Sequence, residues 1–284
     1  MRNHLVHIGA VPVAATFSKL AGGRTNRVWR VDTAGDPIVL KLYRSNRDNP
    51  LFRNDPEAEA LCLAALSSSG LAPNLRAQGE IDGTRWVVYD FSAGTCWRTD
   101  PAPVARMLHR LHRRPALGID LPRGPDGSAD LTAQTRNLIS LCRPDLQPDL
   151  MTLAPGGDVP AAGASAMIHG DPVPGNILCG AKGLCLIDWQ CPVLGDPAED
   201  LALFLSPAMQ FIYRGAALSG AERTAFLGAY PDREVVERYH CLRPWFTWRM
   251  AAYCLWRCQQ GAADYASAYE LECAELRCRL SKIG

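Results

Sequence analysis

The segment spanning residues 167–190 constrains the fold of this 284-residue chain more than any other part of the sequence. It contains His169, Asp171 and Asn176 in the spacing His-x-Asp-x-x-x-x-Asn, with apolar residues before and after. A second apolar run ends at Asp188. Short apolar runs interrupted by Gly and Pro are typical of strands joined by loops. We therefore expect a loop and a hairpin that bring Asp171, Asn176 and Asp188 together.

These three side chains suit the transfer of a phosphoryl group. That reaction needs a carboxylate to orient the attacking hydroxyl and hard oxygen ligands to hold Mg²⁺ on the phosphates. Asn and Asp supply two such oxygens and leave positions for phosphates and water. The alternative is that Asp171 and Asn176 are turn residues, since both types favour turns. The flanking strands and the position of Asp188 favour the catalytic interpretation.

The same motifs resemble those of the aminoglycoside phosphotransferase and choline/ethanolamine kinase family, over about residues 18–205. The resemblance implies an α+β, protein-kinase-like fold of two lobes. A small N-terminal antiparallel sheet with one helix is expected to precede a large, mainly helical C-terminal lobe. The resemblance also implies Asp171 as catalytic base, Asn176 and Asp188 as metal ligands, and ATP and Mg²⁺ as the nucleotide and the ion.

Two further residues are implied to support this centre. His169 is expected to brace the catalytic loop, and Asp200 to do so from the following helix, with direct substrate contact as the alternative for Asp200. The sequence also departs from the family pattern. Pro172-Val173 stand where Leu-His is common, and Trp189-Gln190 stand where protein kinases have Phe-Gly. The second departure argues against a protein-kinase-style activation switch.

The expected lobes are an ATP-binding lobe over residues 1–91 and a catalytic and acceptor-binding lobe over residues 92–284. In the first lobe, Asp55 is a predicted N-cap followed by Pro56, so a helix is expected to begin there and to end before Gly70. Strand-like runs are predicted at 17–21, 27–32, 38–43 and 86–91.

A glycine pair between the first two predicted strands is the candidate phosphate-binding turn. Without side chains, Gly22 and Gly23 allow backbone N–H groups to approach phosphate closely. Most such pairs simply connect a hairpin. The form Gly-Gly-x-Thr25-Asn26-Arg, however, resembles the choline-kinase branch more than the aminoglycoside branch. The resemblance therefore implies ATP contacts by Gly22, Gly23, Thr25 and Asn26.

Lys41 lies inside an apolar predicted strand, where a lysine is costly to bury unless it is paired. It either points to the solvated face of the strand or, as the resemblance implies, contacts phosphate and pairs with a helix glutamate. Glu59 fits that glutamate better than Glu57, because the following leucines and Gly70 then match the family's helix pattern.

The predicted strand 86–91 is implied to lead into a hinge where backbone groups of Tyr89 to Phe91 face adenine. Helical patterns dominate after residue 100, and a helix is expected to begin at the N-cap Asp196. Helices are also predicted at 104–113 and 131–142, a loop at 143–165, and short strands at 166–169, 177–179 and 184–188.

The acceptor prediction depends on the C-terminal part of the chain. Residues 232–284 carry seven acidic and eight basic side chains, a balance that argues against a polycationic aminoglycoside. Trp245 and Trp248 share one helical stripe and Tyr253 lies on the next. Such rings can bind a quaternary ammonium or thiazolium, but such a stripe can also be lobe core.

We therefore expect choline, ethanolamine or a thiamine-like amino alcohol as the small-molecule acceptor. An aminoglycoside or a sugar is the alternative acceptor. An alternative of another class is a catalytically idle, nucleotide-binding pseudokinase, against which the presence of every expected catalytic group argues.

Bulk properties point to a cytoplasmic protein. The net charge of +1 gives no reason to expect nucleic acid or a membrane as partner. No uncharged apolar run approaches the roughly 18 residues of a membrane span. The eleven cysteines form no Cys-x-x-Cys pair and are odd in number, unlike zinc sites or a fully disulfide-paired protein. Buried thiols in a reducing cytoplasm are expected, with metal binding or redox sensing as alternatives.

Overall fold

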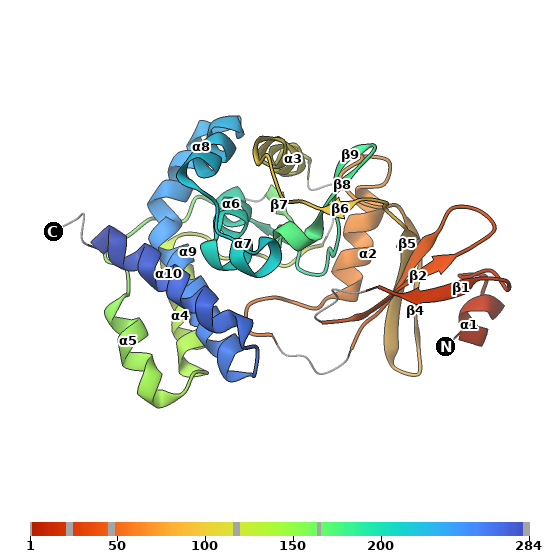
Figure 1. The fold of residues 1–284 in the computed structure, drawn as a ribbon, viewed down its shortest axis with the longest axis horizontal. Coiled ribbons are helices and arrows are strands. Elements are labelled where there is room, and N and C mark those ends of the chain that lie inside the picture. Colours follow the sequence, from red (N-terminus) through yellow and green to blue (C-terminus); the bar gives the residue numbers. More distant parts are fainter. Residues whose placement is uncertain (1, 21–24, 45–48, 116–119, 164–165, 281–284) are drawn as a thin grey trace. The chain divides into compact units, whose positions relative to one another are not determined.

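A computed structural model describes residues 2–20, 25–44, 49–115, 120–163 and 166–280 (Figure 1). These residues form two compact units. The first comprises the described residues up to Cys96 and the segment Gly175–Pro192, and the second comprises most of the remaining chain. The expected lobe boundary after residue 91 stays a prediction. The fold is the predicted α+β arrangement, with an antiparallel sheet in the first unit and mainly helices in the second.

The first unit is built on a five-stranded antiparallel sheet in the order β1-β2-β3-β5-β4. The strands are β1 (Thr16–Lys19), β2 (Arg27–Asp32), β3 (Ile38–Leu42), β4 (Leu75–Ile81) and β5 (Thr84–Asp90). Strand β4 was missing from the sequence prediction. It alternates half-buried and exposed residues and lies at the sheet edge, so its polar sequence lacks the apolar pattern of an inner strand.

The two faces of this sheet have different partners. Alternate residues of β3 and β5, among them Leu40 and Val88, pack with Leu5 of helix α1 (Arg2–His7). Because side chains alternate across a strand, Lys41 and Tyr89 point to the opposite face. That face carries α2 (Pro56–Ala65), which begins where the sequence predicted, at the N-cap Asp55.

A small sheet in the order β6-β8-β9 completes the first unit. It consists of β6 (Thr95–Cys96), β8 (Ile177–Gly180) and β9 (Gly183–Leu186), and the 3₁₀ turn Pro174–Asn176 precedes β8. Register pairs Ile177 with Leu186, and one step further Ile187 N donates to Asn176 O at 2.9 Å. The expected hairpin therefore exists, and its open end carries Asn176 and Asp188.

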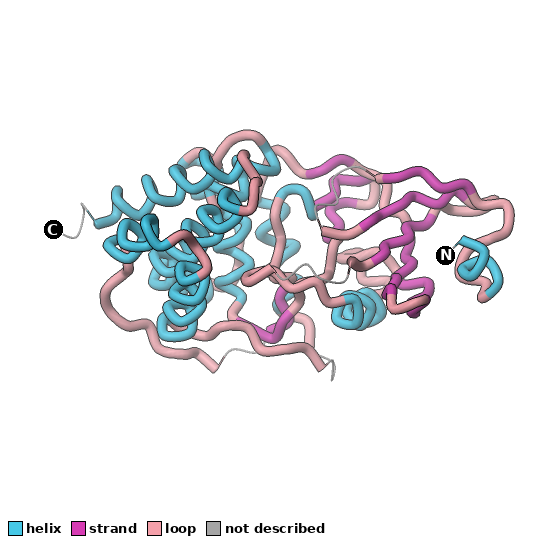
Figure 2. The backbone as a smooth tube through the Cα atoms, turned by 90° about the horizontal axis from the view of Figure 1, so that it is seen from below, coloured by secondary structure: helices cyan, strands magenta, loops and turns pink. Residues whose placement is uncertain are grey.

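The second unit is mainly helical, as Figure 2 shows in cyan. A two-stranded sheet pairs β7 with β10. The segment 143–165, predicted as loop, contains two short helical elements. Pro144 and Pro148 occupy their first turns, and the sequence pattern did not distinguish these prolines from loop prolines. The elements of this unit are α3 (Ala102–His112), α4 (Ser128–Ser140), the 3₁₀ turn Pro144–Leu146, α5 (Gln147–Thr152), β7 (Ala166–Ile168), β10 (Val193–Gly195), α6 (Pro197–Leu205), α7 (Pro207–Arg214), α8 (Gly220–Ala229), α9 (Arg233–Gln259) and α10 (Asp264–Leu280).

Helix α9 is the central element of the second unit and lies side by side with α10 (Figure 1). Its buried Arg249 pairs with Glu199 of α6 at 2.7 Å and donates to Gln134 of α4 at 2.8 Å. One side chain therefore connects three helices. Within the described residues, no helix has the length and low charge needed to cross a membrane.

A second buried acid, Glu272 of α10, caps helix α7. Its Oε1 accepts hydrogen bonds from Ser206 Oγ at 2.5 Å and from Ala208 N at 3.2 Å. Burial raises the pKa of Glu272 from 4.5 to about 7, an effect that the hydrogen bonds only partly offset. Between these pH values the folded chain holds a proton that the unfolded chain has lost. Stability is therefore expected to fall as pH rises through this window.

Replacing Glu272 with Gln is expected to remove this pH dependence. The amide oxygen can still accept both hydrogen bonds, while the cost of burying a charge disappears. Near pH 8 the variant should exceed the wild type in unfolding free energy by about 1–3 kcal/mol, and the difference should shrink toward pH 5. Urea unfolding at both pH values measures this. Glu270→Gln, an exposed change on the same helix, should show neither effect, and an equal gain for Glu272→Gln at both pH values would contradict the prediction.

Candidate active site

Lys41 forms the centre of a buried charged cluster in the first unit. Its side chain is 2% exposed, and its Nζ lies 2.5 Å from Glu59 Oε2 and in direct contact with Asp188 Oδ1. Burial alone lowers the pKa of Lys41, but the carboxylates of Asp188 and Glu59 overcome this and raise the pKa above its ordinary value. Lys41 is therefore a buried, paired cation and does not point to the solvated face of its strand.

Glu59 is the predicted partner, and the structure explains why Glu57 is not. Glu57 is largely exposed and pairs with Arg85 at the surface. Glu59 is fully buried, and burial raises the pKa of its carboxyl group although Lys41 opposes the shift. Its Oε2 accepts two hydrogen bonds, one from Lys41 Nζ and one from the Tyr43 hydroxyl.

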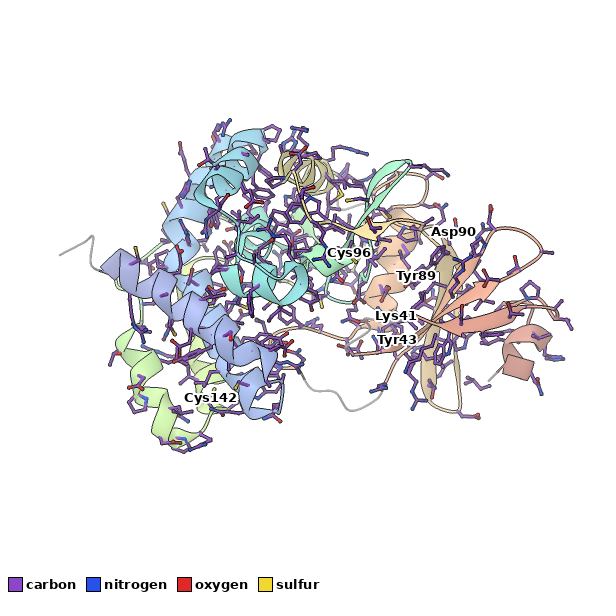
Figure 3. All side chains as sticks on the ribbon, viewed as in Figure 1. Lys41, Tyr43, Tyr89, Asp90, Cys96 and Cys142 are labelled. Atoms are coloured by element: carbon purple, nitrogen blue, oxygen red, sulfur yellow. The ribbon has the colours of Figure 1, made fainter. Side chains whose placement is uncertain are left out.

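Two tyrosines complete the cluster. Tyr43 follows Lys41 by two residues, and its ring centroid lies 5.0 Å from the lysine Nζ. Figure 3 shows Lys41, Tyr43 and Tyr89 close together beside α2. Burial raises the pKa of both phenols, and nearby Glu59 raises them further. Both hydroxyls are therefore protonated, so Tyr43 can only donate to Glu59, and the cluster's negative charge comes from carboxylates.

Asp188 follows β9 with a φ of 65°, a left-handed conformation that is uncommon for a residue other than glycine. Backbone conformations of this kind concentrate at functional sites. Its side chain is 36% exposed, in contrast with the buried Lys41 and Glu59. The oxygens of Asp188 and Asn176, at the open end of one hairpin, are hard ligands of the type that Mg²⁺ prefers. The donor set present in this unit therefore fits that ion.

The residues after Asp188 are fixed to the start of α2. Gln190 O accepts from Asp55 N at 3.2 Å, and the Cys191 thiol donates to Arg53 O at 3.1 Å. The buried Trp189 donates through Nε1 to Leu186 O at 2.9 Å. These bonds hold Asp188 and the helix that carries Glu59 in one assembly. They supply a physical reason for the expected absence of a protein-kinase-style switch.

The side-chain amide of Asn26 is engaged within the first unit. Its Nδ2 donates to Asn54 Oδ1 at 2.6 Å and to Gln190 Oε1 at 2.8 Å. Its Oδ1 accepts from Arg44 N at 3.2 Å and from Asn54 Nδ2 at 3.1 Å. Because these bonds use all the donors and acceptors of the amide, the side chain braces the first unit and is not available to phosphate. An ATP contact by Asn26 stays a prediction and would have to use its backbone.

The remaining predicted nucleotide residues differ in outcome. Gly22 and Gly23 lie outside the described residues, and Thr25 is half-buried. In the predicted hinge, Asp90 N donates to Asn74 O and Phe91 N donates to Pro37 O, each at 3.0 Å. The N–H of Phe91 is therefore engaged in this hydrogen bond. Contacts of adenine with backbone groups of Tyr89 to Phe91 stay a prediction.

Asp171 lies in the second unit, on the loop after β7. Both carboxylate oxygens of Asp200 hold this loop, since Oδ2 accepts from His169 N at 2.8 Å and Oδ1 from Gly170 N at 2.9 Å. The His169 ring accepts from Asp171 N at 3.2 Å. Gly170 has a φ of 76°, which glycine adopts without strain. Asp200 and His169 are therefore both bonded to the backbone of this loop, and the catalytic role of the half-buried Asp171 stays a prediction.

The charge of Asp200 is maintained although the group is fully buried. Burial alone raises the pKa of this carboxyl, but hydrogen bonds from His112 and the loop backbone, with the nearby imidazoles, lower it below its usual value. Since Asp200 is buried and its oxygens are engaged by the loop, direct substrate contact by this residue is not favoured.

The aromatic residues proposed for the acceptor are core residues. Trp245, Trp248 and Tyr253 are at most 6% exposed. The indole of Trp248 donates to Leu150 O at 2.8 Å, and the ring of Tyr253 packs edge-on against Tyr265. Rings buried to this extent have no exposed face for a cation. The alternative reading of the stripe as lobe core is therefore the correct one, and these three residues are not proposed as acceptor ligands.

Two residues of the charged and loop clusters were missing from the sequence prediction. Tyr43 alternates with Lys41 on one strand, so the period of two was a signal for a shared face. His112 ends an amphipathic helix on its apolar side, where a histidine needs a buried polar partner. Both partners, Glu59 and Asp200, are distant in sequence, so the pairings themselves could not be read from spacing.

All eleven cysteines are free thiols, and five of them are buried. Burial raises the pKa of several of these thiols, including that of Cys62 to about 12. Within the ranges that the structure describes, no three His, Cys, Asp or Glu side chains are grouped so as to hold a metal ion. A site built from one carboxylate and one amide, with phosphates as further ligands, is a different kind of site.

Comparison with known proteins agrees with this geometry. The model of a family described as "Phosphotransferase enzyme family" matches residues 16–245. Among curated protein sequences, none matches the chain.

Solved structures with the same fold come from two groups of enzymes. A thermostable mutant of aminoglycoside phosphotransferase APH(4)-Ia is 15% identical, with a TM-score of 0.67, over 98% of this chain and 99% of that chain. Choline kinase from Cryptosporidium parvum Iowa II is 13% identical, with a TM-score of 0.68, over 100% and 97%. A choline/ethanolamine kinase family protein from Mesorhizobium loti is 16% identical, with a TM-score of 0.59, over 98% and 93%. These likenesses establish the kinase-like fold.

Proposed function

The chain belongs to the phosphotransferase enzyme family, and on this premise we propose that it transfers the γ-phosphoryl group of ATP to a hydroxyl group of a small molecule. The observation that carries the proposal is the buried Lys41 held between Glu59 and Asp188. Burying a charged lysine and its acidic partners costs folding free energy. Such a cluster therefore points to a role beyond folding, and phosphate binding is such a role. An aminoglycoside phosphotransferase of the same fold has been solved with ADP and hygromycin B, which supports a nucleotide as the phosphoryl donor.

In the proposed reaction, the residues of this chain mainly position the reactants and neutralise charge on the phosphates. Lys41, oriented by Glu59, neutralises charge on the nucleotide phosphates. The Asp171 carboxylate accepts the proton of the acceptor hydroxyl while the hydroxyl oxygen forms a bond to the γ-phosphorus. The bond from that phosphorus to the β–γ bridging oxygen breaks, and ADP leaves with the electron pair. Such a reaction depends on positioning and electrostatic stabilisation.

Asn176 and Asp188 are the residues proposed to hold Mg²⁺. Bound there, Mg²⁺ would supply positive charge to offset that of the nucleotide phosphates. Asp188 contacts Lys41 in the structure, so Asp188 would hold the ion beside the charge of the lysine. The proposal assigns no role in metal binding to Asp171.

For the acceptor we propose a compact amino alcohol such as choline, ethanolamine or a thiamine-like compound. Support comes from the charge balance of residues 232–284, whose seven acidic and eight basic side chains argue against a polycation as acceptor. The tryptophan stripe no longer supports the preference, since it belongs to the core. Aminoglycosides and sugars are the alternative acceptors, and the solved aminoglycoside phosphotransferases of this fold are the observation in their favour. ATP chemistry of this kind agrees with the cytoplasmic location proposed from the sequence.

An acceptor screen tests the proposal. Purified protein with ATP and Mg²⁺ is incubated with choline, ethanolamine, thiamine, aminoglycosides, amino sugars and simple sugars, and ADP formation is measured. We expect one compact amino alcohol to raise ADP formation at least about tenfold above the rate without acceptor. Stimulation by an aminoglycoside alone would replace the proposed acceptor. If ATP binds but no compound stimulates its consumption, the pseudokinase alternative is favoured.

A further inference from the structure

His112 stands at the end of α3 with both ring nitrogens engaged. Its Nε2 lies 3.0 Å from Asp200 Oδ2 and its Nδ1 lies 2.8 Å from the Tyr230 hydroxyl. The side chain of His112 is 2% exposed, and Tyr230 is buried. Because the Asp200 carboxylate can only accept, Nε2 carries the proton that His112 donates. In the neutral ring Nδ1 then accepts the Tyr230 hydroxyl proton.

Asp200 transmits this arrangement to the loop that carries Asp171. One of its oxygens, Oδ2, accepts from both His112 Nε2 and His169 N, while Oδ1 accepts from Gly170 N. The two backbone donors belong to the residues directly before Asp171. Rotation of the Asp200 carboxylate would break both backbone bonds, and the imidazole on Oδ2 opposes that rotation. The contact is therefore built to fix the loop and not only to neutralise a buried charge.

Tyr230, which follows α8, fixes the imidazole from its other side. The Tyr230 hydroxyl lies within hydrogen-bond distance of His112 in α3. The Tyr230 ring packs edge-on against His109, which is also in α3, with ring centroids 5.3 Å apart. The chain of contacts therefore runs from Tyr230 through His112 and Asp200 to the backbone next to Asp171. Every side chain in it that forms a hydrogen bond is buried, where such bonds are strong and hard to replace by water.

We propose that His112 is a positioning residue for the catalytic loop, with Tyr230 as its support. It does not touch substrate. The effect of His112 on the reaction rate depends on the proposed catalytic role of Asp171. Its effect on the conformation of the loop does not depend on that role. A misplacement of about 1 Å can reduce a reaction rate on the order of 10²-fold. The loss of His112 should therefore lower turnover while leaving the binding of ATP by the first unit unchanged.

The test compares four variants of the full chain. His112→Leu removes both hydrogen bonds, His112→Gln keeps an N–H donor for Asp200, and Tyr230→Phe removes only the hydroxyl. Arg106→Gln, an exposed change on α3, is the control. For each we propose measuring kcat and the KM for ATP with the best acceptor. Amide hydrogen exchange is followed at residues 168–171 and, as an internal reference, in α9.

Under the proposal, His112→Leu lowers kcat by about 10- to 100-fold and leaves the KM for ATP within about twofold. Exchange at His169 and Gly170 rises at least about tenfold while α9 keeps its protection. His112→Gln recovers most of the loss, Tyr230→Phe shows a smaller change in the same direction, and Arg106→Gln resembles the wild type.

Three results would overturn the proposal. They are equal acceleration of exchange in α9 and in the loop, equal damage by His112→Leu and His112→Gln, or unchanged exchange at residues 169–170 in a folded His112→Leu protein. If the wild type consumes no ATP with any acceptor, the proposed function fails. The exchange measurement then still decides whether His112 holds the loop.

Discussion

Changing Asp171 to Asn is expected to reduce acceptor-dependent turnover by about 10²–10⁴-fold, the usual contribution of a positioned general base. The amide has almost the same shape as the carboxylate but cannot take the proton of the acceptor hydroxyl. Asp200 and His169 accept backbone hydrogen bonds that fix the loop. The loop should therefore keep its conformation in the variant, and the melting temperature should stay close to that of the wild type.

Binding of nucleotide separates this prediction from a general loss of structure. The dissociation constant for ADP, measured by calorimetry, should be within about twofold of the wild-type value, because the proposed phosphate residues are in the other unit. Asp149→Asn, an exposed change in the same unit, is the matched control and should leave turnover unchanged. Turnover of the Asp171→Asn protein within threefold of the wild type would remove Asp171 from the mechanism.

Changing Lys41 to Met is expected to damage both nucleotide use and stability. Loss of one preorganised charge on the phosphates typically costs about 10²–10³-fold in turnover. Methionine fills a similar volume, but Glu59 is left buried without its cationic partner, which in other buried pairs costs about 3–5 kcal/mol. The Tyr43 hydroxyl still donates to Glu59, and protonation of Glu59 offers partial relief. We therefore expect a loss near the lower end of that range.

A double substitution distinguishes the two effects. Lys41→Met combined with Glu59→Gln removes the unpaired charge, so unfolding free energy should recover by about 1–3 kcal/mol while turnover stays low. Lys182→Met, which changes an exposed lysine of the β8–β9 turn, should change neither quantity. Recovery of turnover together with stability in the double variant would show that Lys41 has only a structural role.

The sequence predicted those elements whose signals are local. The start of α2 followed from Asp55 and Pro56, and the hairpin that ends at Asp188 followed from its apolar runs. The choice of Glu59 over Glu57 rested on the resemblance to known kinases, and burial accounts for it physically. Strand β4 was missed because an edge strand can be polar on its open side. Helix α5 was missed because it is only six residues long and has a proline in its first turn, which resembles a loop in composition.

Interactions between distant residues could not be predicted in this way. Asn26 carries the turn-forming composition of a phosphate loop, yet its amide is fully used by Asn54, Gln190 and Arg44. A tryptophan stripe on a long helix can line either a pocket or a core, and only the packing of α9 against its neighbours decides for the core. Which hydrogen-bond partner a side chain finds depends on the tertiary fold, since spacing along one element leaves several partners open.

The most direct test of the proposed reaction follows the phosphoryl group itself. ATP labelled at the γ-phosphate is incubated with Mg²⁺ and the best acceptor of the screen, using the wild type and Asp171→Asn side by side. The account predicts label in a phosphate ester of the acceptor, formed in equal amount to ADP by the wild type and at least about 10²-fold more slowly by the variant. Label found only in inorganic phosphate, or ester formed equally fast by both proteins, would contradict it.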